Sequence, residues 1–407
     1  MSKVVINKDK VREVVTRGVE AVYPSPALLT KKLMSGERIR LYCGFDPTGS
    51  ALQIGNTIAL RKLAQFQELG HEVIFLVGDF TGMIGDPTDK KAARRQLSEQ
   101  EVKSNAVFFK KQAAAYINFS GPNPAQILFN STWNKKLKFS DLIDLSARFT
   151  VQQMIQRDMF QARLKDEKPI YLHEFLYPLV QAYDSLVMDV DLEVGGNDQT
   201  FNMMCGRDLL KSVNGKEKFV LTMKLLTDAS GRKMGKSEGN AVFLDNSAAD
   251  MYGKIMSWPD EVILSAFELC TAVSVKEIER IALSLKKGGN PRDLKARLAR
   301  EITAINHGSG AADLAEQQFI NTFRKKEEPA DIAVWQAKRD KYNIVDLLVE
   351  TGLVGSKTEG RRLIEQGAIK VRAGGGFIEV KDAKLELGLK METVVSRGKR
   401  QFVRIIR

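Results

Sequence analysis

Cysteine and histidine are scarce in this sequence, and their scarcity excludes several kinds of site. The 407 residues include three cysteines and three histidines. A disulfide framework needs an even number of cysteines, and a zinc site needs ligands at close spacing. Neither condition is met by Cys43, Cys205, Cys270, His71, His173 and His307. We therefore expect no protein-bound metal and a mechanism that does not depend on a central histidine.

Long apolar runs are also absent. No stretch approaches the roughly 20 apolar residues that a helix needs to cross a bilayer. The first residues, MSKVVINKDKVREVV, lack the apolar stretch of a secretory signal. Hydrophobic residues make up 43% of the chain and charged residues 28%, which is typical of a folded globular protein. We expect a cytoplasmic protein of two or three domains with no membrane partner.

Positive charge is in excess. The formal net charge is +12, and the isoelectric point is about 9.4. Such a charge attracts polyanions, of which nucleic acid is the most common in the cytoplasm. Solubility alone explains the charge equally well, so the charge does not by itself choose a function.

A strand, a helix and a second strand follow one another within residues 39–78. Residues 39–45, IRLYCGF, have the composition of a buried strand. Residues 52–69 carry apolar side chains at helical spacing and end before Gly70, and residues 72–78 form a second apolar run. This unit predicts an α/β fold with a doubly wound parallel sheet of Rossmann type. We expect further strands at residues 185–194 and 218–226, and only helices over residues 248–323.

The last part of the chain has the features of a separate unit. Residues 324–341 are highly charged and contain a proline, which is typical of a linker. Residues 342–407 contain 13 Lys and Arg against 8 Asp and Glu, a net charge of +5. We expect one helix at residues 344–353 and a second that starts with a capping box of Ser356 and Glu359 and ends at Gly367. Strands are expected at residues 368–373, 376–380 and 400–406, around a glycine turn at residues 374–376.

Two loops with several glycines follow strands of the expected sheet, at the edge where such sheets bind ligands. The loop at residues 42–56 precedes a helix whose free N–H groups suit a phosphate. A glycine turn without a ligand explains that loop equally well. The loop at residues 77–87 places glycines around Asp79 and Asp86, and a tight turn is the simpler explanation for it.

A third loop, at residues 227–240, is rich in glycine and lysine. Arg232, Lys233 and Lys236 are concentrated among small residues, as a clamp on polyphosphate requires. The loop is not a P-loop, because that motif needs a glycine five residues before Gly235 and this chain has Ser230.

Taken together, these segments resemble the class I aminoacyl-tRNA synthetases, specifically the bacterial tyrosyl-tRNA synthetase family. YCGFDPTGSALQIGN is similar to that family's first strand and HIGH signature, and VGDFTGMIGDP to its next loop. LYPLVQAYD resembles the tyrosine-binding helix, GGNDQ the ribose loop, and KMGKS the KMSKS loop. SKTEGRRLIEQGAIKV and SRGKRQFVRI resemble an S4 RNA-binding domain. The resemblance covers nearly the whole chain in the family's order.

The resemblance implies that L-tyrosine is activated with ATP, as tyrosyl-adenylate, and then transferred to tRNA(Tyr). The attacking carboxylate is already charged, so catalysis needs positioning and stabilisation of phosphate charge rather than a general base. Mg²⁺ is expected to accompany ATP. The implied catalytic residues are Lys233, Lys236, Ser237, Thr48, Gln53, Asn56, Lys90 and Arg94. Solvated surface charges explain Lys90 and Arg94 almost as well.

The family's tyrosine pocket falls on residues of three segments. Tyr42 and Asp184 would bind the phenol, which phenylalanine lacks, and this family is itself the known example of such discrimination. The remaining implied contacts are Tyr177, Gln181 and Asp86 to the ammonium group, Gln199 to the carboxyl group, and Asp46 and Asn130 more loosely. Tyr177, Gln181 and Asp184 share one helix face. A core-facing helix has the same spacing, but it would bury polar groups at a cost.

Further residues are implied for the nucleotide and for RNA. The ATP site would include Cys43, Gly44, Gly55, Asp198 and Lys236, although Asp198 could instead be a helix N-cap. The RNA-binding residues would be Lys357, Arg361, Arg362 and Lys370.

The chain departs from the family at both histidines of the HIGH signature, which are Gln53 and Asn56 here. Each amide still has an NH₂ donor, so we expect a working but slower activation step. A non-catalytic RNA-binding paralogue is the alternative, and the retained pocket residues weigh against it. A nucleotidyltransferase acting on a small molecule would leave the S4-like tail unexplained.

The expected architecture has four parts. Residues 1–226 form the catalytic domain with an inserted segment, and residues 227–323 the KMSKS-like loop and a helical domain. Residues 324–341 form the linker, and residues 342–407 the small α+β S4 domain. The resemblance implies a homodimer. Residues 142–155 could form part of its interface, although packing into the core explains their apolar character as well.

Overall fold

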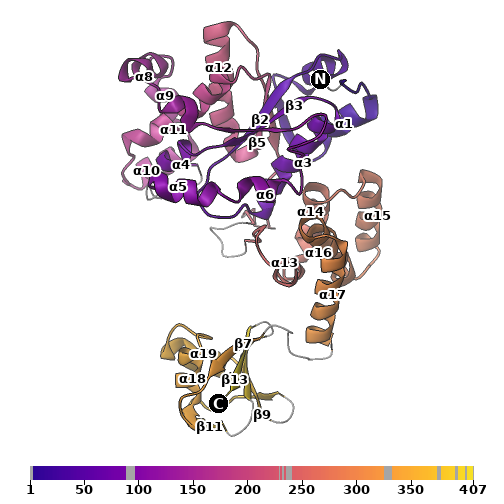
Figure 1. Cartoon of the computed structure of the whole chain (residues 1–407), viewed down its shortest axis with the longest axis vertical. Coiled ribbons are helices and arrows are strands. Elements are labelled where there is room, and N and C mark those ends of the chain that lie inside the picture. The colour runs from indigo at the N-terminus through magenta and orange to yellow at the C-terminus, as the bar shows by residue number, and fades with distance from the viewer. Residues whose placement is uncertain are drawn as a thin grey trace. The chain divides into compact units, whose positions relative to one another are not determined.

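The structure is a computed structural model of the whole chain. It describes residues 3–88, 97–228, 230–231, 233–234, 241–324, 332–373, 377–389, 393–398 and 401–406, without the side chains of 322–324 and 373. The chain divides into two compact units, Met1–Ala312 and Asp313–Arg407 (Figure 1).

A six-stranded sheet forms the centre of the first unit. Its order is β1-β6-β5-β2-β3-β4, and all neighbours are parallel except β1, which is antiparallel to β6. The strands are β1 Val19–Tyr23, β2 Arg40–Phe45, β3 Glu72–Val77, β4 Gln126–Phe129, β5 Leu192–Gly196 and β6 Phe219–Met223. The chain winds outward from β2 through β3 to β4, and then from β5 to β6 on the other side. The predicted doubly wound parallel sheet is therefore confirmed.

The first strand–helix–strand unit is also confirmed. β2 pairs in parallel with β3, and α3 (Ile54–Glu68) connects them and packs on both strands. Apolar side chains line the buried face of α3, among them Ile58, Leu63 and Phe66. Gly70 follows the helix with φ +87°, and a Cβ there would lie 2.6 Å from the Lys3 carbonyl oxygen. Only glycine fits such a turn without strain.

The strand predicted at residues 185–194 is wrong in its first half. Helix α11 (Leu172–Val187) continues through these positions, and β5 starts only at Leu192. The apolar run SLVMDV fits either structure by periodicity, and packing of α11 against α12 (Thr200–Asn214) selects the helix. α12 connects β5 to β6 and α3 connects β2 to β3, and the two helices lie on opposite sides of the sheet (Figure 1).

The first unit contains further helices. They are α1 Lys8–Thr16, α2 Pro26–Met34, α4 Thr81–Ile84, α5 Glu99–Ala106, α6 Phe109–Ala113, α7 Ser131–Asn134, α8 Phe139–Ser146, α9 Val151–Ile155, α10 Asp158–Lys165, α13 Ala248–Met256, α14 Ile263–Cys270, α15 Val275–Lys286 and α16 Pro291–His307. Of these, α13 to α16 form a group to one side of the sheet (Figure 1). The division between the two units falls inside α17 (Ser309–Arg324). As predicted, the described residues between 248 and 323 form helices. α14 packs on α3, so the helical segment is joined to the sheet.

The second unit combines two helices with a five-stranded sheet of order β10-β9-β12-β13-β7. Its elements are β7 Ala333–Gln336, β8 Lys341–Asn343, α18 Ile344–Glu350, α19 Lys357–Glu365, β9 Ile369–Ala373, β10 Ile378–Glu379, β11 Glu386–Gly388, β12 Thr393–Arg397 and β13 Gln401–Ile406. The side chains of Leu347, Ile364 and Val395 are part of its buried core. This α+β arrangement agrees with the expected small C-terminal fold.

Three details of the second unit differ from expectation. β7 lies inside the predicted linker, but it pairs in parallel with β13. The sequence did not predict this strand, because its partner comes 70 residues later and no local pattern indicates the pairing. β12 was not predicted, although it is the central partner of β9 and β13. Ser356 accepts a hydrogen bond from the Glu359 N–H at 3.2 Å, whereas Glu359 accepts from Gly355 instead of Ser356, so the capping box is only half formed. The glycine turn at 374–376 lies outside the described residues.

Two searches of the described residues bear on membranes and metals. Within that part of the chain, no helix is both long and apolar enough to cross a bilayer. The same residues contain no group of three or more His, Cys, Asp or Glu side chains placed to hold a metal ion.

Candidate active site

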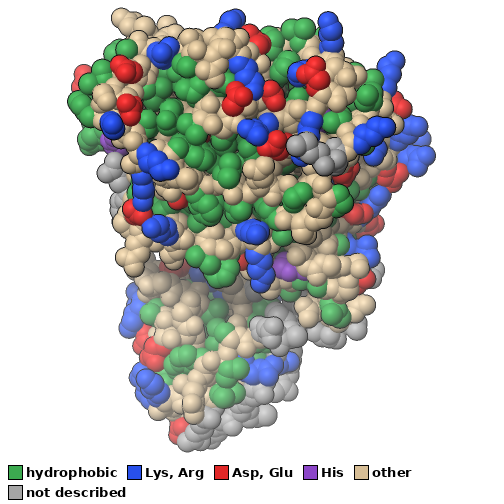
Figure 2. Space-filling view, turned by 45° about the horizontal axis from the view of Figure 1, so that its top comes forward, with side chains coloured by type: hydrophobic (Ala, Val, Ile, Leu, Met, Phe, Trp, Pro, Cys, Tyr) green, Lys and Arg blue, Asp and Glu red, His purple; other side chains and the backbone are tan. Residues whose placement is uncertain are grey.

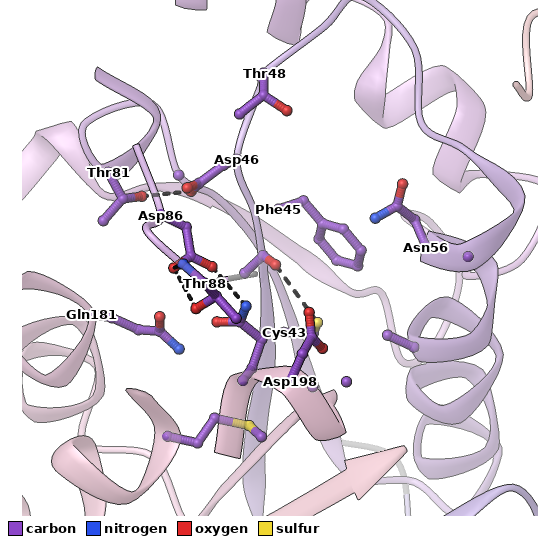
Figure 3. Close-up of a pocket in the computed structure, with 18 of the residues that line it drawn as sticks. Cys43, Phe45, Asp46, Thr48, Asn56, Thr81, Asp86, Thr88, Gln181 and Asp198 are labelled. Carbon is purple, nitrogen blue, oxygen red and sulfur yellow. Dashed lines mark hydrogen bonds between the residues drawn. The ribbon is translucent and has the colours of Figure 1, made fainter. Parts of the chain in front are cut away.

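A cavity of about 940 Å³ opens at the carboxyl ends of β2, β3 and β5 (Figure 3). β2 and β5 are the two neighbours from which the sheet winds in opposite directions, and ligands of such sheets bind at this switch point. The volume is at the upper end of the roughly 300–1,000 Å³ of small-molecule sites, which leaves room for two ligands. Many predicted site residues line it: Tyr42, Cys43, Gly44, Asp46, Thr48, Gln53, Gly55, Asn56, Asp86, Asn130, Tyr177, Gln181, Asp184, Asp198, Gln199 and Lys233.

Asp184 lies at the buried end of the cavity. Its carboxylate accepts hydrogen bonds from Asn130 Nδ2 (3.0 Å), Trp133 Nε1 (2.7 Å) and Asn134 Nδ2 (3.0 Å), which come from the end of β4 and from α7. Burial raises the pKa of Asp184 to about 7, although these three donors favour the charged form. Trp133 and Asn134 were not predicted, because their distance in sequence from Asp184 hides the contact.

Tyr42 faces the same end from β2 and belongs to a buried polar cluster. Its hydroxyl lies 2.8 Å from Ser185 Oγ, which also accepts from Lys218 Nζ at 2.9 Å. Lys218 pairs with Glu193 on β5. Burial, and then the charges of Glu193 and Asp184, raise the pKa of Tyr42 well above its ordinary value. The cluster was not predicted, but one signal was available: charged residues inside or beside buried strands must find a partner.

A second hydrogen-bonded group lies beside Asp184. Asp46 accepts from Thr81 Oγ1 at 2.6 Å and from the Tyr177 hydroxyl at 2.8 Å. Asn130 donates to both Thr81 Oγ1 and Asp184, so this group is continuous with the buried end of the cavity. A Cβ on Gly78 would lie 1.9 Å from Asp46 Oδ1, and glycine is therefore required there.

Asp86 and Gln199 come from opposite walls and meet across the cavity. Asp86 Oδ2 accepts from Gln199 Nε2 at 2.7 Å, and Asp86 Oδ1 accepts from the backbone and side chain of Thr88. Figure 3 shows Asp86 and Thr88 side by side in the cavity. Gln181 extends from α11 and donates to Glu193 Oε1 at 2.9 Å. Tyr177, Gln181 and Asp184 thus share one face of α11 that lines the cavity, as their spacing predicts.

The other side of the cavity is formed by the N-terminus of α3. Gln53 is the residue before the helix, and its N–H donates to Asn56 Oδ1 at 2.9 Å. Because Oδ1 is used in this way, the Asn56 Nδ2 donor is directed elsewhere (Figure 3). Gly44 is exposed toward the cavity on β2, and a Cβ on Gly55 would meet no atom within 4 Å. This side is open and offers N–H donors, as a nucleotide requires.

Lys233 is the described lysine of the KMGKS segment, and it lies on the same cavity. Its Nζ is 3.0 Å from Asp198 Oδ2. Burial raises the pKa of Asp198 to about 6 and lowers the pKa of Lys233, while the charge of Asp86 raises both. Asp198 is not a helix N-cap, since Gln199 holds that position at the start of α12. Lys90, Arg94, Lys236 and Ser237 lie outside the described residues.

Backbone hydrogen bonds fix both ends of the loop that carries Lys233. Within the loop, the Met234 N–H donates to the carbonyl of Leu226, the residue before the loop, at 2.8 Å. After it, Leu244 N–H donates to Leu52, and Ile54 N–H to Val242, each at 2.8 Å. The lysine-rich loop therefore returns to the start of α3, so the two signature segments are neighbours.

The four predicted RNA-binding residues belong to the second unit. Lys357, Arg361, Arg362 and Lys370 are all exposed, on α19 and β9. Lys357 is paired with Asp346 at 2.7 Å. On the face in view in Figure 2, Lys and Arg are scattered among acidic and apolar side chains.

The comparisons with known proteins agree with one another. The family described as tRNA synthetases class I (W and Y) matches residues 34–324, and the tyrosine–tRNA ligase SYY-like C-terminal domain matches residues 325–405. A tyrosine–tRNA ligase of Moorella thermoacetica is 41% identical over 397 residues, covering 96% of this chain and 94% of its own. One of Geobacter metallireducens is 42% identical over 382 residues, covering 93% of each chain.

Solved structures share the fold. A C-terminally truncated mitochondrial tyrosyl-tRNA synthetase of Aspergillus nidulans aligns with TM-score 0.67 and 24% identity, over 77% of this chain and 94% of that one. The tyrosyl-tRNA synthetase of Archaeoglobus fulgidus, solved with L-tyrosine, aligns with TM-score 0.60 and 21% identity, over 76% of this chain and 100% of that one. With two family models covering residues 34–405 and relatives above 40% identity, the chain belongs to the class I tRNA synthetases of the tryptophan and tyrosine type.

Proposed function

We propose that the cavity of the first unit binds tyrosine and ATP next to each other and joins them as tyrosyl-adenylate. The chain is a tyrosine–tRNA ligase, since relatives of that name are about 41% identical over nearly its full length. The non-catalytic alternative is not favoured. The observation that carries the site assignment is the meeting, in one cavity, of Tyr42 and Asp184 with Lys233 and the N-terminus of α3.

Tyrosine would lie with its phenol between Tyr42 and Asp184. An ionised carboxylate has about four acceptor positions, and three of those on Asp184 are filled by Asn130, Trp133 and Asn134. The remaining one can accept the phenol proton. The ammonium group would reach Tyr177, Gln181 and Asp86, which supply oxygen acceptors, and the carboxyl group would reach Gln199. Asp46 and Asn130 would hold the side chains of Tyr177 and Asp184 in place.

ATP would lie against the start of α3, with Cys43, Gly44 and Gly55 beside the nucleoside and Thr48 near the phosphates. A tyrosine carboxylate oxygen attacks the α-phosphorus, and the bond to the bridging oxygen of pyrophosphate breaks. The developing charge on pyrophosphate is stabilised by cations. Lys233 leaves Asp198 for the phosphates, which frees Asp198 to bind a ribose hydroxyl. We assign the same charge-stabilising role to Lys236, Ser237, Lys90 and Arg94, which lie outside the described residues.

Mg²⁺ would accompany ATP. It prefers phosphate oxygens and water, with few protein ligands. The ion would neutralise charge on the triphosphate.

Replacing Asn56 with alanine is expected to lower kcat for pyrophosphate exchange by about 10- to 100-fold, the effect of losing one hydrogen bond to a charged group. Asn56→Asp is the matched variant, because its carboxylate still accepts from the Gln53 N–H but has no donor for the phosphates. It should be at least as slow. Asn56→His should stay within a few-fold of the parent, and an unimpaired Asn56→Asp would contradict the donor role.

Tyrosine affinity is expected to rise with pH and to level off above about 7. Burial raises the pKa of Asp184 to about 7. Only its ionised form accepts the phenol proton, so protonation below that pKa weakens binding. Equilibrium dialysis of labelled tyrosine without ATP, over about two pH units on either side of 7, measures this. An affinity that stays constant below pH 7 would show that Asp184 does not titrate during binding.

The second unit would hold tRNA, through the exposed basic residues of α19 and β9. We keep the four expected segments, 1–226, 227–323, 324–341 and 342–407, as functional divisions of the chain, and we place the reaction in the cytoplasm.

We also propose a homodimer. Leu145 and Met154 pack into the core of the first unit, but Phe139, Ile143 and Val151 of the same region are exposed. Exposed apolar side chains of this kind, on α8 and α9, suit an interface between two copies.

Exchange of labelled pyrophosphate into ATP tests the activation step directly. We expect exchange with tyrosine and almost none with phenylalanine. Exchange that is absent with tyrosine, or equal for both amino acids, would reject the proposed pocket.

A further inference from the structure

A buried lysine is connected by two successive hydrogen bonds to Tyr42, a residue that lines the cavity. Lys218 Nζ contacts Ser185 Oγ at 2.9 Å, and Ser185 Oγ lies 2.8 Å from the Tyr42 hydroxyl, which lines the cavity. The Lys218 side chain is 0% exposed, and that of its partner Glu193 is 3% exposed. A buried ion pair contributes little to stability compared with apolar packing, so its position beneath Tyr42 calls for another explanation.

The fold makes room for this lysine. Lys218 directly precedes β6, Glu193 is on β5, and Ser185 is on α11. Gly206 on α12 completes the enclosure: a Cβ there would lie 2.6 Å from Lys218 Nζ and 2.8 Å from Ser185 Oγ. Any larger residue would push the lysine away from the serine.

The directions of these hydrogen bonds follow from counting protons. A lysine ammonium group only donates, so Ser185 Oγ accepts from Lys218. Ser185 then has one proton, for either Tyr42 at 2.8 Å or Glu193 at 3.3 Å. The shorter distance is typical of a hydroxyl–hydroxyl bond and the longer one is not. Glu193 also accepts from Lys218 and from Gln181, so it has other donors when Ser185 turns to Tyr42. Ser185 therefore donates to Tyr42.

The same counting of protons can be continued from Tyr42 to the substrate phenol. Tyr42 also has Glu193 as a hydrogen-bond partner. Once Tyr42 accepts from Ser185, its own proton can be donated either to Glu193 or into the cavity, where a bound phenol oxygen can accept it. The phenol proton is then available to the remaining acceptor position of Asp184. If Tyr42 instead donated to Ser185, both Tyr42 and Asp184 would need to accept a proton from the phenol. The phenol has only one proton, so one of these buried acceptors would stay unsatisfied, which is costly.

We propose that Lys218 and Ser185 are positioning residues that set the direction of hydrogen bonding at Tyr42, so that the pocket selects a substrate hydroxyl able to accept and donate at once. The hydrogen bonds run from Lys218 through Ser185, Tyr42 and the phenol to Asp184. This inference rests on the proposed placement of the phenol. Hydrogen bonds arranged in one direction strengthen each other, so the ends of the series act on the middle.

The test is the ratio of kcat/KM for tyrosine to kcat/KM for phenylalanine, measured by pyrophosphate exchange in the full-length chain. Lys218→Met and Ser185→Ala should each lower the ratio about tenfold, the effect of one hydrogen bond, through the tyrosine value alone. The double variant should lose little more than either single variant, because the two residues act in series. A purely structural role would lower both values together and leave the ratio unchanged.

The chain offers a matched control in a second buried ion pair, Arg163 with Glu174, whose side chains are 1% and 3% exposed. Arg163→Met should affect stability but not the ratio. An equal change of the ratio in Arg163→Met would overturn the proposal. If Lys218→Met does not fold, Ser185→Ala decides, since it keeps the Lys218–Glu193 pair.

Tyr42→Phe separates this inference from the function on which it rests. If Tyr42→Phe lowers the ratio while Ser185→Ala and Lys218→Met leave it unchanged, the phenol placement stands and the directed series is wrong. If Tyr42→Phe also leaves the ratio unchanged, the phenol placement itself fails.

Discussion

Replacing Asp184 with alanine is expected to abolish measurable tyrosine binding and to lower kcat/KM for tyrosine by at least about 10³-fold. The substitution removes the acceptor of the phenol proton. It also leaves the donors of Asn130, Trp133 and Asn134 without their buried partner. A substrate hydroxyl that loses its buried, charged hydrogen-bond partner costs binding about 2–5 kcal/mol, and about 4 kcal/mol corresponds to 10³-fold. Equilibrium dialysis of labelled tyrosine and pyrophosphate exchange both measure the loss.

Asp191→Ala is the matched control for that experiment. Asp191 is also a hydrogen-bonded aspartate near the sheet, and it accepts from the Arg40 N–H at 2.8 Å, but it does not line the cavity. Its loss should leave tyrosine binding within a few-fold of the parent. Tyrosine binding that survives in Asp184→Ala, in a protein shown to be folded, would contradict the assignment of the phenol end.

Removing residues 325–407 is expected to separate the two steps of the reaction. All of the described residues that line the cavity belong to the first unit, so pyrophosphate exchange should stay within a few-fold of the full chain. Charging of tRNA should fall by at least about 10²-fold, because the exposed basic residues of α19 and β9 are lost. A cut at residue 342 would be less clean, since it would leave β7 without its partner β13.

A milder variant supports the truncation experiment. Replacing Lys357, Arg361, Arg362 and Lys370 with glutamine should weaken tRNA charging without affecting activation. It should also reduce the dependence of tRNA binding on salt, because fewer counterions are released from the RNA. Charging that remains intact after truncation would show that the second unit is not needed for productive tRNA binding.

The parts of the fold that could be predicted are those with local, repeated patterns. The run IRLYCGF, the helical spacing up to Phe66 and the glycine at position 70 together identified β2, α3 and β3 correctly. The end of α11 could not be predicted, because SLVMDV has the same apolar content in a helix or a strand, and packing on α12 decides between them. β7 is a short exposed strand whose partner lies far along the chain.

In the candidate site, too, residues within one motif could be predicted, and the residues that hold them in place could not. Motif spacing brought Tyr177, Gln181 and Asp184 to one helix face that lines the cavity. The side chains that hold these residues come from other segments. Trp133 on α7 donates to Asp184, and Lys218, which directly precedes β6, donates to Ser185. Such contacts depend on the order of strands in the sheet rather than on neighbouring residues, so no local pattern reports them.

The Gln53 and Asn56 departure from the family signature has a structural explanation in this chain. Asn56 Oδ1 accepts from the Gln53 N–H at the start of α3. An asparagine therefore caps the helix and keeps one amide donor at the same time. Under the proposed function, the asparagine keeps a donor for the nucleotide.

A crystal structure with a non-hydrolysable analogue of tyrosyl-adenylate tests the central claim most directly. The account predicts the phenol oxygen within hydrogen-bonding distance of both Tyr42 and Asp184, the α-phosphate at the start of α3, and Lys233 turned from Asp198 toward the phosphate. An analogue bound elsewhere, or a phenol oxygen out of reach of Asp184, would contradict it.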